Sequence, residues 1–302
     1  MRIGLTGASG LIGRATTQAL TERGDTVVTF VRPAGGAATG ETIRWDPAAN
    51  DLDDDDLRRV GGLDAIVHLA GAGIGDRRWS DERKDLILQS RLASTALVVR
   101  AIESLASGVG VLASGSAIGI YGSRGSELLD ETSTHGSDFL ASVCRAWEDA
   151  AQPAADSGTV VTTLRTGIVM SARGGALKRQ LPLFKLGLGG VLGDGRQWIS
   201  PISLVDEVRA ILSIIDQPEA GPVNLSAPDP VTNRAFTRAL AHALGRPAML
   251  RVPAVALALA LGPELAHEAV LASQRVQPAK LINRGFRFAH PTTPELLVAA
   301  LH

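Results

Sequence analysis

The sequence has 302 residues, with 30 Lys and Arg against 31 Asp and Glu, so the formal net charge of −1 gives no reason to expect a nucleic-acid partner. Hydrophobic residues make up 45% of the chain and charged residues 20%, which excludes the composition of disordered proteins. The single cysteine, Cys144, excludes an intramolecular disulfide bond and a cysteine-rich zinc site.

No segment has the length of a membrane span. The longest apolar stretch, Ala254 to Leu261, is far shorter than the roughly 18 to 20 residues that cross a bilayer. The chain starts without a basic segment followed by an apolar one and a cleavage site. We therefore expect no membrane partner and a cytoplasmic location.

Short strand-like runs alternate with helical patterns over the first 170 residues. The expected strands are Arg2 to Thr6, Thr26 to Val31, Thr42 to Trp45, Ala65 to Leu69, Val109 to Ala113 and Thr159 to Arg165. The expected helices are Leu11 to Arg23, Leu52 to Val60, Asp81 to Ser104 and Phe139 to Ala155. This alternation predicts an α/β fold, a Rossmann-type doubly wound parallel sheet with helices on both faces.

Beyond residue 170 the chain becomes richer in Gly and Pro. The expected helices there are Leu204 to Asp216, Arg234 to Leu244, Pro253 to Leu261 and Pro294 to Leu301. We expect residues 1–170 to form the Rossmann domain and residues 171–302 to form mainly a smaller C-terminal substrate domain. The Leu204 helix and the strand around Val223 are candidates to return to the main sheet, over about 204–226.

Gly7, Gly10 and Gly13 form a GxxGxxG pattern after the first expected strand. With 33 glycines in the chain the pattern alone is weak, and it also starts at Gly4, Gly119 and Gly187. Only the Gly7 instance lies in the first βα turn, where backbone N–H groups at a helix N-terminus can hold a pyrophosphate. This context predicts a dinucleotide site, and a purely structural glycine turn is the alternative.

The second expected strand ends Phe30-Val31-Arg32, at the place where a carboxylate would hold the ribose 2′-hydroxyl of NAD. An arginine there pairs instead with a 2′-phosphate, which favours NADP(H). A solvated arginine at a strand end is the alternative.

These residues carry a resemblance to the extended short-chain dehydrogenases/reductases. More narrowly, the chain resembles the epimerase-family proteins sometimes labelled cell-division inhibitors, an atypical NADP-binding branch. The matching stretches are Thr6 to Gly13, Leu69-Ala70-Gly71, Asp76 to Trp79, Ser90-Arg91, Ser114 to Gly122, Leu164 to Gly167, Leu186 to Gly190, Gly195 to Trp198, Gly221 to Leu225, Gln274-Arg275-Val276 and Gly285 to Phe288. They cover nearly the whole chain.

The resemblance implies a set of cofactor contacts beyond the glycine turn. The expected cofactor-binding residues are Gly7, Ala8, Ser9, Gly10, Leu11, Ile12, Gly13, Val31, Arg32, Leu69, Ala70, Gly71 and Arg91. Arg91 is a candidate second phosphate partner. The alternative is a solvent-exposed arginine on a helix.

The resemblance fails where catalysis is expected. Reductases and epimerases of this superfamily use Ser, Tyr and Lys, with Tyr and Lys spaced YxxxK on a helix. The one tyrosine, Tyr121, has no lysine four residues after it. Aligning Trp147-Glu148 with the usual end of that helix places Leu140 at the Tyr position and Cys144 at the Lys position, so the acid/base pair is missing.

Ser116, which matches the superfamily serine, and Tyr121 are the remaining candidate catalytic residues, with Ser114 and Asp138 nearby. An unassisted tyrosine with a pKa near about 10 is a poor base at neutral pH. Tyr121 also matches a tyrosine that is usually structural in these folds. Cys144 fits a buried small hydrophobe better than a nucleophile.

On the substrate side, Arg77, Arg78 and Trp79 follow the fourth strand at the carboxyl edge of the sheet, where such folds bind ligands. The alternative is that Trp79 packs under a helix capped by Ser80 and the arginines are solvated. Further candidates for an anionic or sugar-like pocket are Arg173, Lys178, Arg196 and Trp198. The scattered histidines predict no metal.

The sequence therefore predicts an NADP(H)-binding oxidoreductase that acts on an unidentified small molecule without the YxxxK pair. Two alternatives stay open: a non-catalytic, NADPH-responsive regulator or scaffold, and a nucleotide-sugar epimerase-like enzyme. The second is weakened because epimerisation relies on the same missing pair. The sequence does not reveal the oligomeric state.

Overall fold

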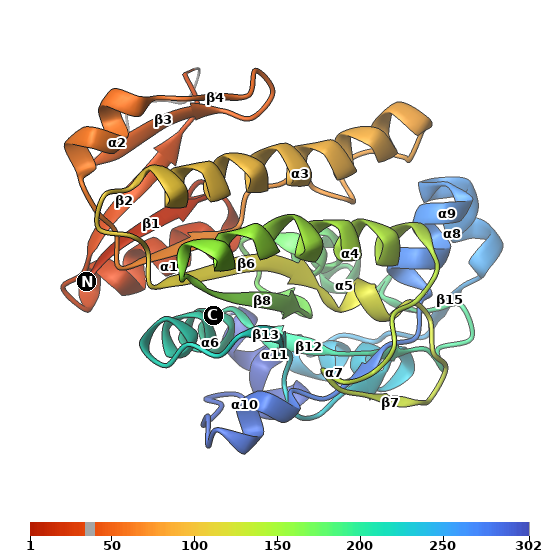
Figure 1. The fold of residues 1–302 in the computed structure, drawn as a ribbon. Coiled ribbons are helices and arrows are strands. Elements are labelled where there is room, and N and C mark those ends of the chain that lie inside the picture. The colour runs from red at the N-terminus through yellow and green to blue at the C-terminus, as the bar shows by residue number, and fades with distance from the viewer. Residues whose placement is uncertain (34–39, 302) are drawn as a thin grey trace.

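A computed structural model describes residues 1–33 and 40–301, and its ribbon is drawn in Figure 1. Its centre is a mostly parallel eight-stranded sheet in the order β13-β8-β6-β5-β1-β2-β3-β4. The strands of this sheet are β1 (Arg2–Thr6), β2 (Thr26–Val31), β3 (Thr42–Asp46), β4 (Asp51–Leu52), β5 (Ala65–His68), β6 (Val111–Ala117), β8 (Val160–Thr166) and β13 (Gly221–Leu225). Only β4 pairs antiparallel, with β3. The predicted α/β, Rossmann-type fold is confirmed.

Helices cover both faces of the sheet. They are α1 (Leu11–Glu22), α2 (Asp54–Val60), α3 (Asp81–Ser104), α4 (Phe139–Ala151) and α6 (Leu204–Asp216). In Figure 1, α3 and α4 run side by side over one face, and α6 lies against the other, where it contacts α1.

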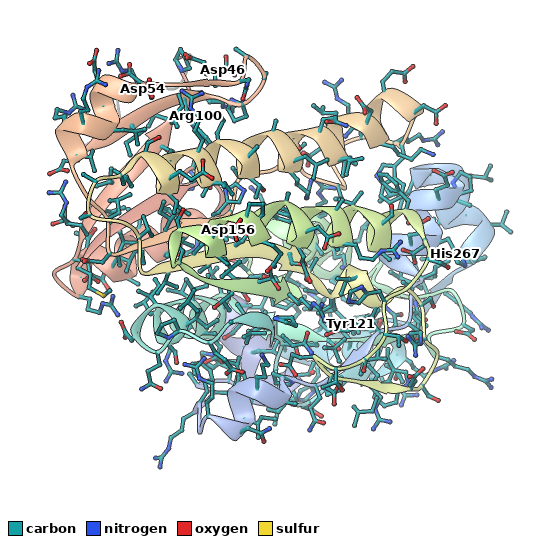
Figure 2. All side chains as sticks on the ribbon, viewed as in Figure 1. Asp46, Asp54, Arg100, Tyr121, Asp156 and His267 are labelled. Atoms are coloured by element: carbon teal, nitrogen blue, oxygen red, sulfur yellow. The ribbon has the colours of Figure 1, made fainter. Side chains whose placement is uncertain are left out.

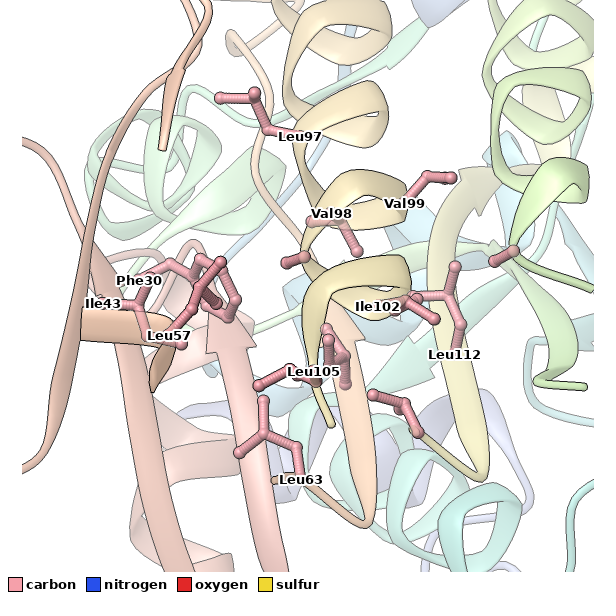
Figure 3. Close-up of a cluster of buried hydrophobic side chains, with 14 of the residues drawn as sticks. Phe30, Ile43, Leu57, Leu63, Leu97, Val98, Val99, Ile102, Leu105 and Leu112 are labelled. Atoms are coloured by element: carbon pink, nitrogen blue, oxygen red, sulfur yellow. The ribbon is translucent and has the colours of Figure 1, made fainter. Parts of the chain in front are cut away.

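Each face has its own hydrophobic core. Figure 3 shows the core beneath α3, in which Val98 and Ile102 pack toward strand residues such as Phe30 and Leu112. The core on the α1 and α6 face joins Ile3 and Leu5 of β1 to the apolar side of α6. The two layers hold the carboxyl ends of the central strands at one edge of the sheet.

Most expected boundaries lie within one residue of the observed ones, and three elements differ by more for local reasons. The expected Leu52 to Val60 helix begins only at Asp54, because the Asp53 carboxylate caps it by accepting the Asp56 N–H at 2.9 Å. The fourth helix ends at Ala151 and continues as a 3₁₀ helix, Gln152–Ser157, with a proline in its first turn.

The expected Val109 to Ala113 strand lies instead at Val111–Ala117. Its later residues, Ser114, Gly115 and Ser116, are polar or small and resemble a turn in sequence, yet all three pair in register with β8. The strand therefore reaches the carboxyl edge of the sheet, at Ala117.

The C-terminal half adds short strands and helices outside the eight-stranded sheet. Its strands are β9 (Ile168–Met170), β10 (Gly190–Leu192), β11 (Trp198–Ile199), β12 (Pro201–Ser203), β14 (Val231–Thr232), β15 (Leu250–Val252) and β16 (Arg275–Val276), which pairs with β7 (Leu128–Leu129). Its helices are α5 (Gly175–Lys185), α7 (Asn233–Ala243), α8 (Ala254–Leu261), α9 (Pro263–Leu265), α10 (Ala279–Asn283) and α11 (Thr293–Leu301). Two further short turns of helix are the 3₁₀ segment Ile118–Tyr121 and the π-helical segment Ala266–Val270.

The segment from α6 to β13 belongs to the sheet layers. Val223 in β13 pairs with Leu164 in β8, so this strand forms one edge of the main sheet. The division into domains 1–170 and 171–302 stays a prediction. None of the described helices is both long and apolar enough to span a bilayer.

Candidate cofactor and substrate site

The carboxyl ends of β1, β2, β5, β6 and β8 meet at one edge of the sheet, because these strands are parallel. In Figure 1 this edge faces the C-terminal helices α8 and α9. Ligands of open α/β sheets bind outside the carboxyl ends of the strands.

The glycine turn has the geometry of a phosphate cradle. Gly7 has φ +69°, and a Cβ there would lie 2.8 Å from the Leu69 backbone. A Cβ on Gly13 would lie 2.2 Å from the Gly7 carbonyl oxygen, so only glycine lets helix α1 approach the turn. Gly10 is the N-cap of α1 and has no side chain with which to cap it.

The free amides of the first turn of α1 therefore point out of the helix toward the carboxyl edge. Ser9 and Gly10 are exposed, and Leu11 and Ile12 are half-buried. A Cβ on Gly10 would approach only the Gly7 carbonyl oxygen, at 3.2 Å. The turn thus offers both donors and space for a pyrophosphate.

The other expected cofactor residues lie along the same edge. Val31 ends β2, and Arg32 follows it with an exposed side chain. Leu69 and Ala70 are half-buried directly after β5, and both donate backbone N–H bonds to the Thr6 hydroxyl, at 3.0 and 3.2 Å.

Arg91 lies on α3 beside Gly71. Its guanidinium lies 4.8 Å from the centre of the Trp147 ring, and its Nη1 donates to the carbonyl oxygens of Ala72 (3.0 Å) and Ile87 (2.8 Å). A Cβ on Gly71 would lie 3.3 Å from the guanidinium carbon. Burial, together with the nearby Arg83 cation, lowers the Arg91 pKa. A half-buried cation next to the cradle is suited to an anionic ligand.

Ser116 forms a hydrogen bond to a buried ion pair, Glu148–Arg165, that the sequence does not predict. The Ser116 hydroxyl donates to Glu148 Oε1 at 2.6 Å, and Arg165 binds both oxygens of the same carboxylate, at 2.8 and 2.9 Å. Ser116 is 5% exposed and Arg165 is 3% exposed. The Glu148 carboxylate holds the Arg165 pKa above its ordinary value, although burial alone would lower it.

Tyr121 belongs to the same network and is completely buried. Its hydroxyl donates to Asn224 Oδ1 at 2.7 Å and accepts from Arg165 Nη1 at 3.1 Å. Burial raises the Tyr121 pKa to about 12. Figure 2 shows Tyr121 among the side chains between β8 and the segments below it. The geometry favours the structural role, and a catalytic role for Ser116 or Tyr121 stays a prediction.

The two positions at which the sequence places the missing YxxxK pair lie on α4, and both face the core. Leu140 is 8% exposed and Cys144 is 5% exposed. Burial raises the pKa of the Cys144 thiol to about 12, which keeps it protonated and unreactive.

Of the two neighbouring candidates, Asp138 caps α4 by accepting the Ala141 N–H at 2.8 Å. Ser114 is fully buried, and its hydroxyl has no hydrogen-bond partner among the described residues.

On the substrate side, the indole of Trp79 is used for packing. Its N–H donates to the Ile74 carbonyl at 2.8 Å, and its ring meets Phe139 edge to face at 5.1 Å. Arg78 donates to backbone carbonyls at the end of α8, including Ala260 at 3.1 Å. These contacts favour the packing alternative for Trp79 and Arg78, while Arg77 is exposed.

A surface groove of about 450 Å³ lies between the start of α3 and α9. Its lining residues are Trp79, Ser80, Asp81, Glu82, Lys84, Gly262, Pro263, Glu264 and Leu265. Arg173, Lys178 and Arg196 are exposed elsewhere, and Trp198 lies under the Arg275 guanidinium at 4.3 Å. Over residues 1–33 and 40–301 no group of three or more His, Cys, Asp or Glu side chains could hold a metal.

Comparison with known proteins identifies the family to which the chain belongs. Residues 3–226 match the model of the NAD dependent epimerase/dehydratase family, and residues 252–300 match a domain of unknown function. An epimerase family protein of Mycobacterium tuberculosis is 44% identical over 98% of this chain and 96% of its own length. The cattle epimerase family protein SDR39U1 is 33% identical over 96% of both chains.

Solved structures agree with this assignment. A crystal structure of human epimerase family protein SDR39U1 with NADPH superposes with a TM-score of 0.89, at 29% identity and 99% coverage of both chains. A nucleoside-diphosphate sugar epimerase from Corynebacterium glutamicum gives a TM-score of 0.79 at 35% identity. That match covers all of this chain and 58% of the other.

Proposed function

Since the chain belongs to the NAD dependent epimerase/dehydratase family, as an extended short-chain dehydrogenase/reductase, we propose that it binds NADP(H) and uses it in redox chemistry on a small molecule. The observation that carries the proposal is the glycine turn. A Cβ on Gly13 would lie 2.2 Å from the Gly7 carbonyl, and the packing that glycine permits leaves the amides of α1 free to bind a pyrophosphate.

The preference for NADP(H) over NAD(H) rests on Arg32. Arg32 directly follows β2, and β2 pairs with β1, the strand that leads into the glycine turn. At this position the guanidinium pairs with a ribose 2′-phosphate through charge-assisted bonds. The NADPH in the crystal structure of the human relative supports the same preference.

When bound, the cofactor supplies the hydride, and the chain orients the reactants at the carboxyl edge. The proton has to come from elsewhere, because Leu140 and Cys144 stand where the family has its Tyr and Lys. The hydroxyls of Ser116 and Tyr121 already donate to Glu148 and Asn224, which favours water as the proton source.

A non-catalytic, NADPH-responsive protein is the second candidate. It is favoured by the buried network, in which hydrogen bonds to one another and to Glu148 occupy the polar groups of Ser116, Tyr121 and Arg165. A nucleotide-sugar epimerase has less support because epimerisation also uses the missing pair.

Titration of the purified protein with NADPH and NADH, followed by cofactor fluorescence, tests the binding proposal. We expect NADPH to bind at least about tenfold more tightly, since a paired phosphate adds about 1.4 kcal/mol or more. Equal titration curves would contradict the assignment of NADP(H).

A panel of ketones, alcohols and nucleotide sugars then separates the two candidates. We expect hydride transfer to some carbonyl substrates, at rates about 10² to 10⁴ below those of enzymes with the Tyr–Lys pair. Tight NADPH binding with no oxidation of the cofactor by any substrate would favour the non-catalytic protein.

A further inference from the structure

Three fully buried side chains, Thr6, His68 and Thr95, form a continuous row of hydrogen bonds beneath the glycine turn. Thr6 ends β1 and His68 ends β5, and the two residues are direct partners in the parallel ladder. Thr95 lies on α3. None of the chemistry proposed above uses this row.

The Thr6 hydroxyl determines the direction of the hydrogen bonds. It accepts the backbone N–H groups of Leu69 and Ala70, at 3.0 and 3.2 Å, which occupies both of its lone pairs. Its single proton is then left for His68 Nδ1, at 2.7 Å. The Nδ1 atom is therefore an acceptor without a proton of its own.

The other ring nitrogen must carry the proton of the neutral imidazole. His68 Nε2 lies 3.0 Å from the Thr95 hydroxyl, which in turn donates to the Arg91 carbonyl oxygen at 2.7 Å. All hydrogen bonds of the row therefore point from donor to acceptor in one direction, from the amides after β5 through the imidazole to the backbone of α3.

The surroundings keep the ring neutral and prevent it from turning. Burial, with the Arg91 cation nearby, lowers the His68 pKa to about 3. The indole rings of Trp45 and Trp147 meet the imidazole edge to face, at 6.5 and 6.3 Å. A flipped ring would place carbon atoms against both threonine hydroxyls and would break both hydrogen bonds of the imidazole.

The groups at the two ends of the row are the ones expected to hold the cofactor. Leu69 and Ala70 form the wall against which Gly7 packs, because a Cβ on Gly7 would lie 2.8 Å from the Leu69 backbone. The Arg91 backbone, held at the other end, carries the guanidinium that lies beside Gly71.

We propose that His68 is a positioning residue of the NADP(H) site, which fixes the Leu69–Ala70 peptides and the Arg91 backbone relative to the glycine turn through its Nε2–H tautomer. This inference rests on the proposed function. A preorganised site binds a ligand more tightly because it loses less conformational freedom on binding.

Isosteric substitutions test the row. Thr6→Val removes the hydroxyl and keeps the shape, and Thr6→Ser restores the hydroxyl. Thr162→Val is the matched control, since Thr162 is a fully buried strand residue of the same sheet whose hydroxyl donates to the Glu219 carbonyl. We expect NADPH affinity to fall about tenfold or more in Thr6→Val, and to change less than about threefold in Thr6→Ser and Thr162→Val.

A second measurement does not depend on the folding of a variant. Nitrogen-15 NMR of the wild-type imidazoles should show His68 as the neutral Nε2–H tautomer from pH 5 to 8, with or without NADPH. An Nδ1–H tautomer, or titration of His68 in that range, would overturn the inference. If Thr6→Val does not fold, the row is broken at its other end by Thr95→Val combined with Ser94→Ala, because the Ser94 hydroxyl also lies 3.4 Å from His68 Nε2. This double variant is compared with the same control.

The outcomes separate this inference from the proposed function. Wild-type protein that binds no NADPH overturns the proposed function, and with it the role of the row. Suppose instead that the wild-type protein binds NADPH and that Thr6→Val, or the double variant of Ser94 and Thr95, binds it as tightly as Thr162→Val does. That result overturns only the positioning role of His68.

Discussion

At the scale of single residues, Arg32 is the group on which the proposed preference for NADP(H) rests. It is exposed at the end of β2, so replacing it removes a charge without creating a cavity. We expect Arg32→Ala to lose most of the preference for NADPH, because an unpaired 2′-phosphate gains nothing over a hydroxyl there. Titrations with NADPH and NADH check this, with Arg14→Ala on the exposed face of α1 as control. An unchanged ratio of the two dissociation constants in Arg32→Ala would assign the preference to another residue.

Glu207 is a second residue whose surroundings lead to a measurable prediction. It lies fully buried on α6, where Thr166 donates to its Oε1 at 2.9 Å and its Oε2 has no partner among the described residues. Burial raises its pKa from 4.5 to about 8. The folded protein therefore binds this proton more tightly than the unfolded chain does.

The sign of the pH effect follows from that raised pKa. The stability contributed by the protonated carboxyl is fully present below the unfolded pKa and is lost as pH rises through about 8. We compare the unfolding free energy of Glu207→Leu with that of the wild type at each pH. We expect this difference to shift in favour of the variant by on the order of 3 to 5 kcal/mol between pH 4.5 and pH 8.5. Urea denaturation at the two pH values measures it. The exposed Glu103→Leu control should show no such difference, and parallel profiles for both variants would refute a buried neutral Glu207.

At the scale of elements, α4 shows why the missing pair is not restored by two substitutions. Leu140 and Cys144 are buried, and Cys144 belongs to a cluster with Ile120, Tyr121 and Val276. A lysine at position 144 would be desolvated and would face the Arg91 cation, the same cation that acts on the Cys144 thiol.

We therefore expect Leu140→Tyr combined with Cys144→Lys to lose about 3 kcal/mol or more of stability and to gain no activity on ketones. Urea denaturation and single-turnover oxidation of NADPH measure the two effects. Cys144→Met has a similar length without the charge and is the control. A stable double variant with rapid turnover would show that α4 still presents these positions to the site.

The elements also show how far the sequence predicts this fold. The bounds of β1, β2, α3 and α6 agree residue for residue with those expected. The two helices begin at clear N-caps, Ser80 and Ser203. The sequence misplaces β6 because Ser114, Gly115 and Ser116 interrupt the hydrophobic pattern of this buried strand.

The site was predictable only where it is local in sequence. The glycine turn and Leu69–Ala70 are contiguous motifs, and both lie at the expected edge. The Glu148–Arg165 ion pair and the Thr6–His68 bond join residues 17 and 62 positions apart. The packing of α4 over the sheet brings Glu148 to Arg165, and the register of β1 with β5 brings Thr6 to His68. A periodicity along the chain cannot reveal either pair.

At the scale of the whole molecule, the C-terminal half shares its core and its hydrogen bonds with the N-terminal half. One hydrophobic cluster joins Ile3 of β1 to Ile211 of α6 and Leu225 of β13. The segment after α8 is tied in as well, since β16 pairs with β7 and the Glu268 carboxylate accepts the Leu140 N–H at 3.0 Å.

We therefore expect unfolding to be one cooperative transition, because neither half can bury its apolar surface alone. Differential scanning calorimetry checks this by comparing the calorimetric enthalpy with the van't Hoff enthalpy, which should agree. NADPH should raise the midpoint of that single transition, since a ligand bound only by the folded state stabilises everything that unfolds with its site. Two transitions, with only the first 170 residues responding to NADPH, would instead favour two independently folding domains divided near residue 170. In that case the contacts of Glu268 and β16 with the N-terminal half would contribute little to stability, and Glu268→Gln would leave both transitions unchanged.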